Sequence, residues 1–204
     1  MMIRQIRIAV LATALMLTGM VVQAQDEHPA QALVVTAVSD ILNVYENEAD
    51  RLKSEPAYLD AKIEELIVPY LDFETMTKLA VSKFWRRADQ NQRDQLVEEF
   101  TKLLKNTYTN ALAEYNGDGG EVSFEPFRPE RREDRAVVRS TFSQSGGKPI
   151  PVVYKLRDRN GWSIYDIEAN DFSLVTGYRS AFSSEIEKGG IDGLINSIRE
   201  RNGS

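Results

Sequence analysis

The fold of this chain is decided by residues 150–168, which read IPVVYKLRDRNGWSIYDIE. Apolar side chains alternate with other residues on both sides of a central turn, and this period of two predicts β-strands. The turn contains the pair Asn160-Gly161, which tolerates the positive φ angles of a tight hairpin. The stretch therefore predicts two antiparallel strands joined by a short turn.

Two further strands are predicted between this hairpin and Gly120. Alternating apolar positions occur at Val122 and Phe124 in the first strand, and from Ala136 to Phe142 in the second. Gly146-Gly147 then supplies the turn into the hairpin. Four consecutive strands with short connections predict an antiparallel meander over residues 121–168.

Helices are predicted on both sides of this sheet. Residues 31–53 and 89–115 carry apolar side chains at three- and four-residue steps, and two shorter helices lie between them. Asp72 is placed to cap the second short helix, and Asp89 with Gln92 has capping-box spacing. After the sheet, two closing helices are separated at Gly189-Gly190.

These elements predict the α+β class, with an antiparallel four-stranded meander sheet packed with N-terminal and C-terminal helices. The helical part covers residues 31–116, the sheet residues 121–168 and the closing helices residues 173–201. The pattern leaves two interpretations of the apolar surface open. Val153 lies opposite Val152 and Tyr154, so helices could cover both faces of the sheet, or the sheet and the long helix could enclose a cavity.

The N-terminus has the three-part layout of a secretory signal peptide. Basic residues Arg4 and Arg7 precede an apolar run that is short for a membrane span, and Val22-Gln23-Ala24 forms a cleavage site. We expect residues 1–24 to be removed, leaving residues 25–204 as a single domain; the alternative is an uncleaved anchor. The chain has no cysteine, so neither disulfides nor a thioether-linked lipid can form. We therefore expect an exported protein that is free in solution.

The charge balance disfavours nucleic acid as a partner. The formal net charge is −6, and loss of Arg4 and Arg7 leaves 23 basic against 31 acidic residues, or −8 for the mature chain. An acidic surface repels nucleic-acid phosphates and anionic membrane faces.

Few residues suit catalysis. The chain has one histidine, His28, and it contains no phosphate-binding loop, nucleophile elbow or calcium loop. Asp166 and Asp171, with a nearby tyrosine, are what remains for acid–base chemistry; the competing interpretation is that they end a strand and cap a helix. We expect a protein that is not an enzyme and has no catalytic residues, metal site or cofactor.

Several stretches together resemble the MlaC (toluene-tolerance auxiliary) family. They are residues 68–76, 84–93, 100–115, 161–168, 173–182 and 190–195, in that order along most of the mature chain. Two positions depart from the family pattern: Ser82 stands where glycine is usual, and Asp171-Phe172 stands where Gly-Val is common.

The resemblance implies a periplasmic phospholipid carrier with its cargo in an apolar pocket between sheet and helices. The implied partners are an inner-membrane ABC transporter complex and an outer-membrane lipoprotein–porin complex, which would make the protein part of the maintenance of outer-membrane lipid asymmetry. We expect a monomer. Two alternatives stay open: a small Asp/Tyr acid–base enzyme on a cone-shaped α+β fold, and an adaptor without a ligand.

Candidates for the lipid-binding wall recur on single faces of elements that such a pocket would bring together. They are Phe100, Leu104 and Tyr108 on the long helix, Val152, Tyr154 and Ile164 on the strands, and Val175 and Tyr178 on the following helix.

Overall fold

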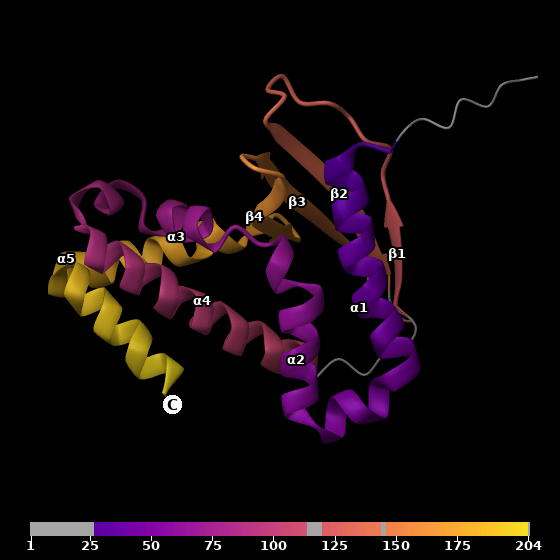
Figure 1. Ribbon diagram of the computed structural model, residues 1–204, viewed down its shortest axis with the longest axis horizontal. Helices are drawn as coiled ribbons and strands as arrows, with labels where there is room; N and C mark the ends of the chain where they lie inside the picture. The colour runs from indigo at the N-terminus through magenta and orange to yellow at the C-terminus, as the bar shows by residue number, and fades with distance from the viewer. Residues whose placement is uncertain (1–26, 114–119, 144–145, 204) are drawn as a thin grey trace, which may run out of the picture.

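The structure is a computed structural model that describes residues 27–113, 120–143 and 146–203 (Figure 1). The predicted signal peptide, residues 1–24, lies outside these ranges, as does the predicted end of the helical part at residue 116.

Helices and short 3-10 turns precede the sheet. In chain order they are α1 (Pro29–Ser54), α2 (Pro56–Leu66), η1 (Val68–Tyr70), α3 (Phe73–Val81), η2 (Ser82–Arg87) and α4 (Gln90–Ala113). Both predicted caps are confirmed. The Thr75 N–H donates to Asp72 Oδ1 at 2.9 Å, and the Gln92 N–H donates to Asp89 Oδ1 at 2.8 Å.

The sheet is an antiparallel meander in the order β1-β2-β3-β4-β5. Its strands are β1 (Glu121–Phe124), β2 (Arg135–Ser143), β3 (Ile150–Asp158), β4 (Trp162–Ala169) and β5 (Phe172–Ser173). The predicted α+β class is confirmed, but the number of strands was wrong by one. The fifth strand has only two residues, which is too short to show any alternation in the sequence.

The chain closes with α5 (Leu174–Asn202), which Ser173 caps by accepting a hydrogen bond from the Thr176 N–H at 3.1 Å. The helix is interrupted at Gly190, whose φ of 72° is left-handed, so the predicted break between two closing helices is present. Figure 1 shows α3, α4 and α5 gathered beside the sheet, while α1 runs along it.

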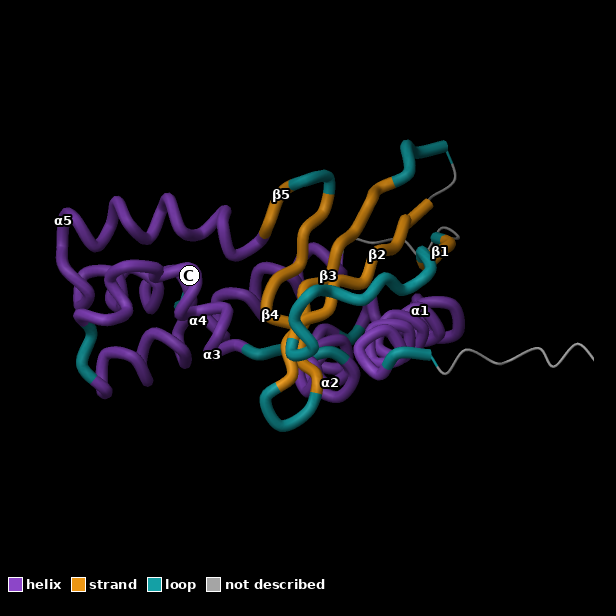
Figure 2. Tube along the Cα trace, turned by 90° about the horizontal axis from the view of Figure 1, so that it is seen from above, coloured by secondary structure: helices purple, strands orange, loops and turns teal. Residues whose placement is uncertain are grey.

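One face of the sheet packs on α1, and the other carries charged residues. Viewed from above, α1 and α2 lie on the same side of the strands (Figure 2). Ala136, Val138, Leu156 and Ile164 face α1, whereas Arg139, Lys155 and Glu168 alternate with them on the opposite face. The interpretation that helices cover both faces is therefore wrong. Tyr165 sits at a register shift in β4, and the Arg135 guanidinium lies over its ring.

The buried apolar residues form three clusters. One joins α3, η2, α4 and α5, a second joins the start of α1 to the sheet, and a third joins the end of α1 to α2. Leu71 packs against the first two, and Val68 and Ile67 against the third. The short η1 segment thus lies where the three clusters meet.

Candidate ligand-binding cavity

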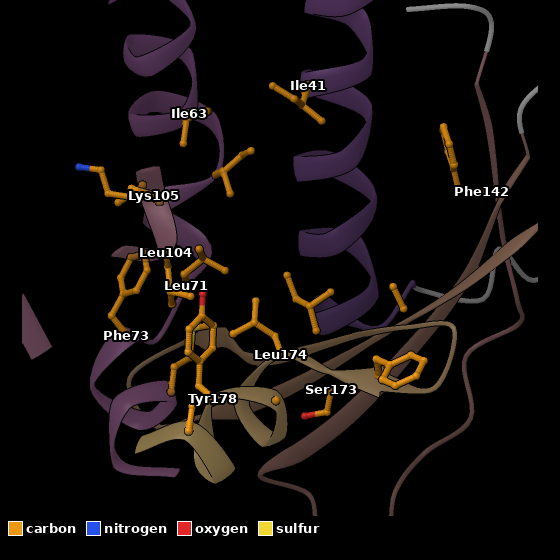
Figure 3. A pocket seen from close by; sticks show the side chains of 18 of the residues that line it. Ile41, Ile63, Leu71, Phe73, Leu104, Lys105, Phe142, Ser173, Leu174 and Tyr178 are labelled. Atoms are coloured by element: carbon orange, nitrogen blue, oxygen red, sulfur yellow. The ribbon is translucent and has the colours of Figure 1, made fainter. Parts of the chain in front are cut away.

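A cavity of about 890 Å³ lies at this meeting point, bounded by the covered face of the sheet and by each of the described helices α1 to α5. Figure 3 shows the side chains that converge on it from separate elements. Its wall consists of Ile41, Leu42, Tyr45, Ile63, Ile67, Val68, Leu71, Phe73, Met76, Leu104, Lys105, Phe142, Ile167, Ala169, Phe172, Ser173, Leu174, Gly177, Tyr178, Ala181 and Arg201.

The apolar stripe of α1 explains how one helix can serve both core and cavity. Val34 near its start and Leu52 near its end are buried in separate clusters. Ile41, Leu42 and Tyr45, in the middle of the same stripe, line the cavity. The helix therefore bridges two packed regions, and its central turns face a space that no side chain of a described residue fills.

The mouth of the cavity is marked by residues that line it and are also exposed to solvent. Ala169, Phe172, Gly177, Ala181 and Arg201 have both properties. The first four come from the end of β4, from β5 and from the first turns of α5, and Arg201 comes from the end of α5. The cavity therefore opens where the chain passes from the sheet into the closing helix.

The wall carries two cationic side chains and no carboxylate among the described residues. Lys105 forms an ion pair with Glu64 of α2, and Arg201 donates to both carboxylate oxygens of Glu185 at 2.9 Å. In Figure 3 the ammonium group of Lys105 points away from the centre of the cavity. The space itself is thus apolar, with charge confined to its edge.

One polar group does enter this space. Figure 3 shows the Tyr178 hydroxyl pointing into the cavity, and it forms no hydrogen bond with any residue that the structure describes. The Tyr178 ring is held from behind by edge-to-face contact with Phe100 and by Phe182. An apolar ligand with a polar group at the right depth would satisfy this hydroxyl.

The structure places the eight predicted wall residues in different environments. Leu104 and Tyr178 lie on the cavity wall. Phe100 and Val175 are buried in the helical cluster, and Ile164 is buried between α1 and the sheet. Tyr154 packs beside Ile164, where burial raises the pKa of its hydroxyl. Val152 pairs with Ala169 without reaching the wall, and the side chain of Tyr108 lies outside the described part of the chain.

Most of the wall was absent from the predicted set. Ile41, Leu42 and Tyr45 belong to a stripe that the sequence shows clearly, and Phe142 belongs to a predicted strand. The signal that could have identified Ile41, Leu42 and Tyr45 as wall residues is their position in the middle of a long helix. Phe172 gave no such signal, since it belongs to a strand of two residues.

The two aspartates considered for acid–base chemistry do not face the cavity. Asp166 is buried on the other face of the sheet, where Lys155 Nζ lies 3.1 Å and Ser173 Oγ 2.8 Å from its Oδ2. Its Oδ1 accepts a hydrogen bond from the Val175 N–H at 3.2 Å, so this carboxylate fixes the start of α5. Asp171 lies exposed in the β4–β5 turn and does not cap α5, because Ser173 does.

The size of the cavity indicates that it is not a packing defect. An unfilled cavity forgoes about 24 cal/mol for each Å³, so 890 Å³ kept empty would forgo on the order of 20 kcal/mol. This exceeds the ~5–15 kcal/mol of net stability that whole domains usually have. The space must therefore be occupied, by solvent or by a ligand, and its apolar wall favours an apolar ligand.

None of the described helices has a stretch long and apolar enough to cross a membrane. Fold and cavity together define an α+β protein built around one large apolar binding site. The model of the MlaC protein family matches residues 35–200, and the chain belongs to this family.

Relatives and a solved structure agree with this assignment. The chain is 27% identical over 176 residues to the toluene tolerance protein ttg2D of Pseudomonas putida, covering 84% of this chain and 78% of the relative. It is 21% identical over 173 residues to the intermembrane phospholipid transport system binding protein MlaC of Haemophilus influenzae, covering 82% and 79%.

The solved structure is that of a phospholipid-binding protein from Ralstonia solanacearum in complex with a phospholipid. It superimposes with a TM-score of 0.77 at 34% identity, and the match covers 86% of this chain and 98% of that one.

Proposed function

We propose that the mature protein is a periplasmic carrier that holds the acyl chains of one phospholipid in the cavity, with the head group at the mouth. The observation that carries this proposal is the large apolar cavity that opens beside β5 and α5. The phospholipid in the related Ralstonia solanacearum protein supports the same class of cargo.

The volume of the cavity supports one diacyl lipid as the cargo. A methylene group takes about the room of a water molecule, roughly 30 Å³, so 890 Å³ accommodates on the order of thirty methylenes. That number corresponds to two chains of about fifteen carbons. A second phospholipid would need about twice this space.

The energetics of lipid transfer explain why such a cavity is needed. At ~0.8 kcal/mol for each methylene, two chains of about fifteen carbons cost ~24 kcal/mol to expose to water. Spontaneous escape from a bilayer is therefore very slow. A carrier must replace water around the chains while keeping its own outer surface soluble, and a net charge of −8 on the mature chain serves solubility.

As a member of the MlaC family, the carrier would exchange its cargo with an inner-membrane ABC transporter complex and with an outer-membrane lipoprotein–porin complex. In this role the protein needs no catalytic residue. Asp166 then fixes the start of α5 by accepting a hydrogen bond from the Val175 N–H, and Asp171 occupies a left-handed position in the β4–β5 turn.

Lipid analysis of the purified mature protein tests the proposal. We expect native mass spectrometry to show a species heavier than the chain by one phospholipid, and organic extraction to release an intact diacyl lipid. Protein stripped of lipid should reload from phospholipid vesicles. A homogeneous ligand-free protein that takes up no phospholipid would end the carrier proposal.

A further inference from the structure

Phe172 stands out on the surface. It is 83% exposed, and no other large hydrophobic side chain among the described residues is exposed. It also lines the cavity, at the mouth. A bare aromatic ring in water is unfavourable, and a ligand that fills the cavity up to its mouth would remove this ring from water.

The backbone around Phe172 is fixed by contacts on both sides. Asn170 and Asp171 have φ angles of 49° and 64°, the left-handed pair that a tight hairpin turn requires. The Asn170 N–H donates to the Pro151 carbonyl at 3.1 Å, and Ser173 Oγ donates to Asp166 Oδ2 at 2.8 Å. Phe172 is thus held in place at the rim by an ordered turn.

The pairing of β4 with β5 sets the direction of the ring. Phe172 pairs with Ala169, and directly paired residues of antiparallel strands point to the same face. Ala169 lines the cavity, so the Phe172 ring is on the cavity face. Ser173, the next residue, turns its hydroxyl to Asp166 on the opposite face.

We propose that Phe172 is the retention gate of the cavity: its ring packs over the acyl chains of the bound phospholipid near the mouth and slows their release. This inference rests on the proposed function. The ring is continuous with the apolar wall, so cargo that fills the cavity covers the ring as well. Gating of this kind changes the release rate more than the amount of lipid that the cavity holds.

A bilayer surface is the other apolar environment that could cover the ring, and the local charge disfavours it. Asp171 lies next to Phe172 at the tip of the turn, and the mature chain carries a net charge of −8. One aromatic side chain next to an acidic residue provides little membrane affinity, since even a single myristoyl chain binds only marginally.

Release of a head-group-labelled phospholipid from the loaded mature protein tests the gate. The acceptors are methyl-β-cyclodextrin, which has no bilayer, and phosphatidylcholine vesicles. We expect Phe172→Ala to release lipid about tenfold faster into both acceptors, with the same lipid content at saturation. Phe172→Trp, which keeps an aromatic ring, should release at the wild-type rate or more slowly.

Asp171→Asn is the matched control, because it changes the charge of the turn and keeps both the ring and a residue that tolerates positive φ. It should release at the wild-type rate. Because Phe172 is exposed, the Phe172 variants should keep the wild-type melting temperature in the lipid-free form. Equal release by Phe172→Ala and wild type into cyclodextrin would overturn the gate. Release by Phe172→Ala that is slower than wild type into vesicles only would also overturn the gate, because it would show that the ring contacts the bilayer. Wild-type protein that never loads would instead overturn the carrier function itself.

Discussion

The ring of Phe100 meets the ring of Tyr178 edge to face, with centroids 4.9 Å apart. Phe100 is fully buried in the helical cluster, whereas Tyr178 directs its hydroxyl into the cavity (Figure 3). The pair therefore joins a residue that stabilises the fold to one that faces the ligand. Substitutions at these two positions should separate stability from binding.

At Tyr178 we expect binding to change while stability does not. The hydroxyl forms no hydrogen bond with a described residue, so Tyr178→Phe should alter the free energy of unfolding by less than about 0.5 kcal/mol. A bound phospholipid offers ester carbonyl oxygens to this hydroxyl. Loss of one such hydrogen bond, worth about 0.5–1.5 kcal/mol, should weaken phospholipid binding roughly two- to tenfold in a competition assay. Unchanged affinity would show that the hydroxyl does not contact the lipid.

At Phe100 the opposite balance is expected. Phe100→Ala removes a fully buried ring that packs on both Tyr178 and Phe182, and it should cost about 3–5 kcal/mol in the free energy of unfolding. Urea denaturation of the lipid-free protein measures this cost. A loss below about 1 kcal/mol would mean that the helical cluster is not packed around Phe100.

Ser82 is strained by its backbone conformation. Its φ of 56° and ψ of −125° fall in a region that glycine occupies far more easily than other residues. The MlaC family pattern usually has glycine at this position. Such strain costs about 1–3 kcal/mol, of which the extra chain entropy of glycine offsets part. Ser82→Gly should therefore raise stability by about 1 kcal/mol, or about 2–4 °C in melting temperature. Ser82→Ala keeps the Cβ and should bring no such gain.

The local features were predictable because they are encoded by neighbouring residues. The caps at Asp72 and Asp89 and the turn at Asn160-Gly161 need only a few consecutive side chains, and the strand alternation needs only a short window. The separation of wall from core is a different kind of property. Val34 and Ile41 occupy one stripe with similar side chains, yet one is buried and the other lines the cavity.

What decides between wall and core is the distance between elements that are far apart in the chain. Ile41 faces a gap because α2, α4 and the sheet meet around it without closing, and no pattern within α1 records that gap. Phe172 was unpredictable for a related reason. Its exposure follows from a two-residue strand and from the path of the chain into α5, which the period-two pattern cannot show.

The buried carboxylate of Glu99 makes stability depend on pH. Burial raises the pKa of Glu99. Hydrogen bonds from Asn202 and Arg199 and the nearby charge of Lys102 lower this pKa by more than burial raises it, so the pKa falls below its ordinary value of 4.5. A pKa that is lower in the folded protein than in the unfolded chain stabilises the fold at pH values above the pKa of the unfolded chain. That stabilisation is lost as the pH falls through the pKa of the folded protein.

We expect Glu99→Gln to reduce the free energy of unfolding at neutral pH by about 1–3 kcal/mol, since hydrogen bonds to a charged group are lost. The gap between wild type and variant should narrow when the pH is lowered well below 4.5. Urea denaturation of both proteins across this range measures the gap. A gap that stays constant with pH would contradict an ionised Glu99 in the folded protein.

Asp166→Asn distinguishes a structural carboxylate from a catalytic one. The substitution removes the negative charge beside Lys155 and weakens the contacts that fix Ser173 and Val175, so it should cost about 1–3 kcal/mol of stability. Phospholipid loading should be unchanged, because Asp166 is not on the cavity wall. Wild-type conversion of bound lipid to a product of different mass, lost in this variant, would favour the enzyme alternative instead.

Gly177 allows the cavity to be blocked without disturbing the core. It lies in a regular part of α5 at the mouth, and a Cβ added there would meet no heavy atom within 4 Å. Replacing a helical glycine generally stabilises, because glycine has the largest chain entropy to lose. We expect Gly177→Ala to gain about 0.5–1 kcal/mol and to load lipid normally. Gly177→Phe should fold equally well but place a ring in the mouth and load little phospholipid.

Gly193→Phe is the matched control for this substitution. Gly193 lies in the same helix beyond the break at Gly190, also has open space around an added Cβ, and does not line the cavity. Native mass spectrometry of the three variants after exposure to phospholipid vesicles compares their lipid content at equal folded concentration. Full loading of Gly177→Phe would show that lipid binds elsewhere. Equal loss in Gly193→Phe would show that a bulky residue anywhere on α5 disturbs binding, because the helix as a whole, rather than the mouth, would then control access.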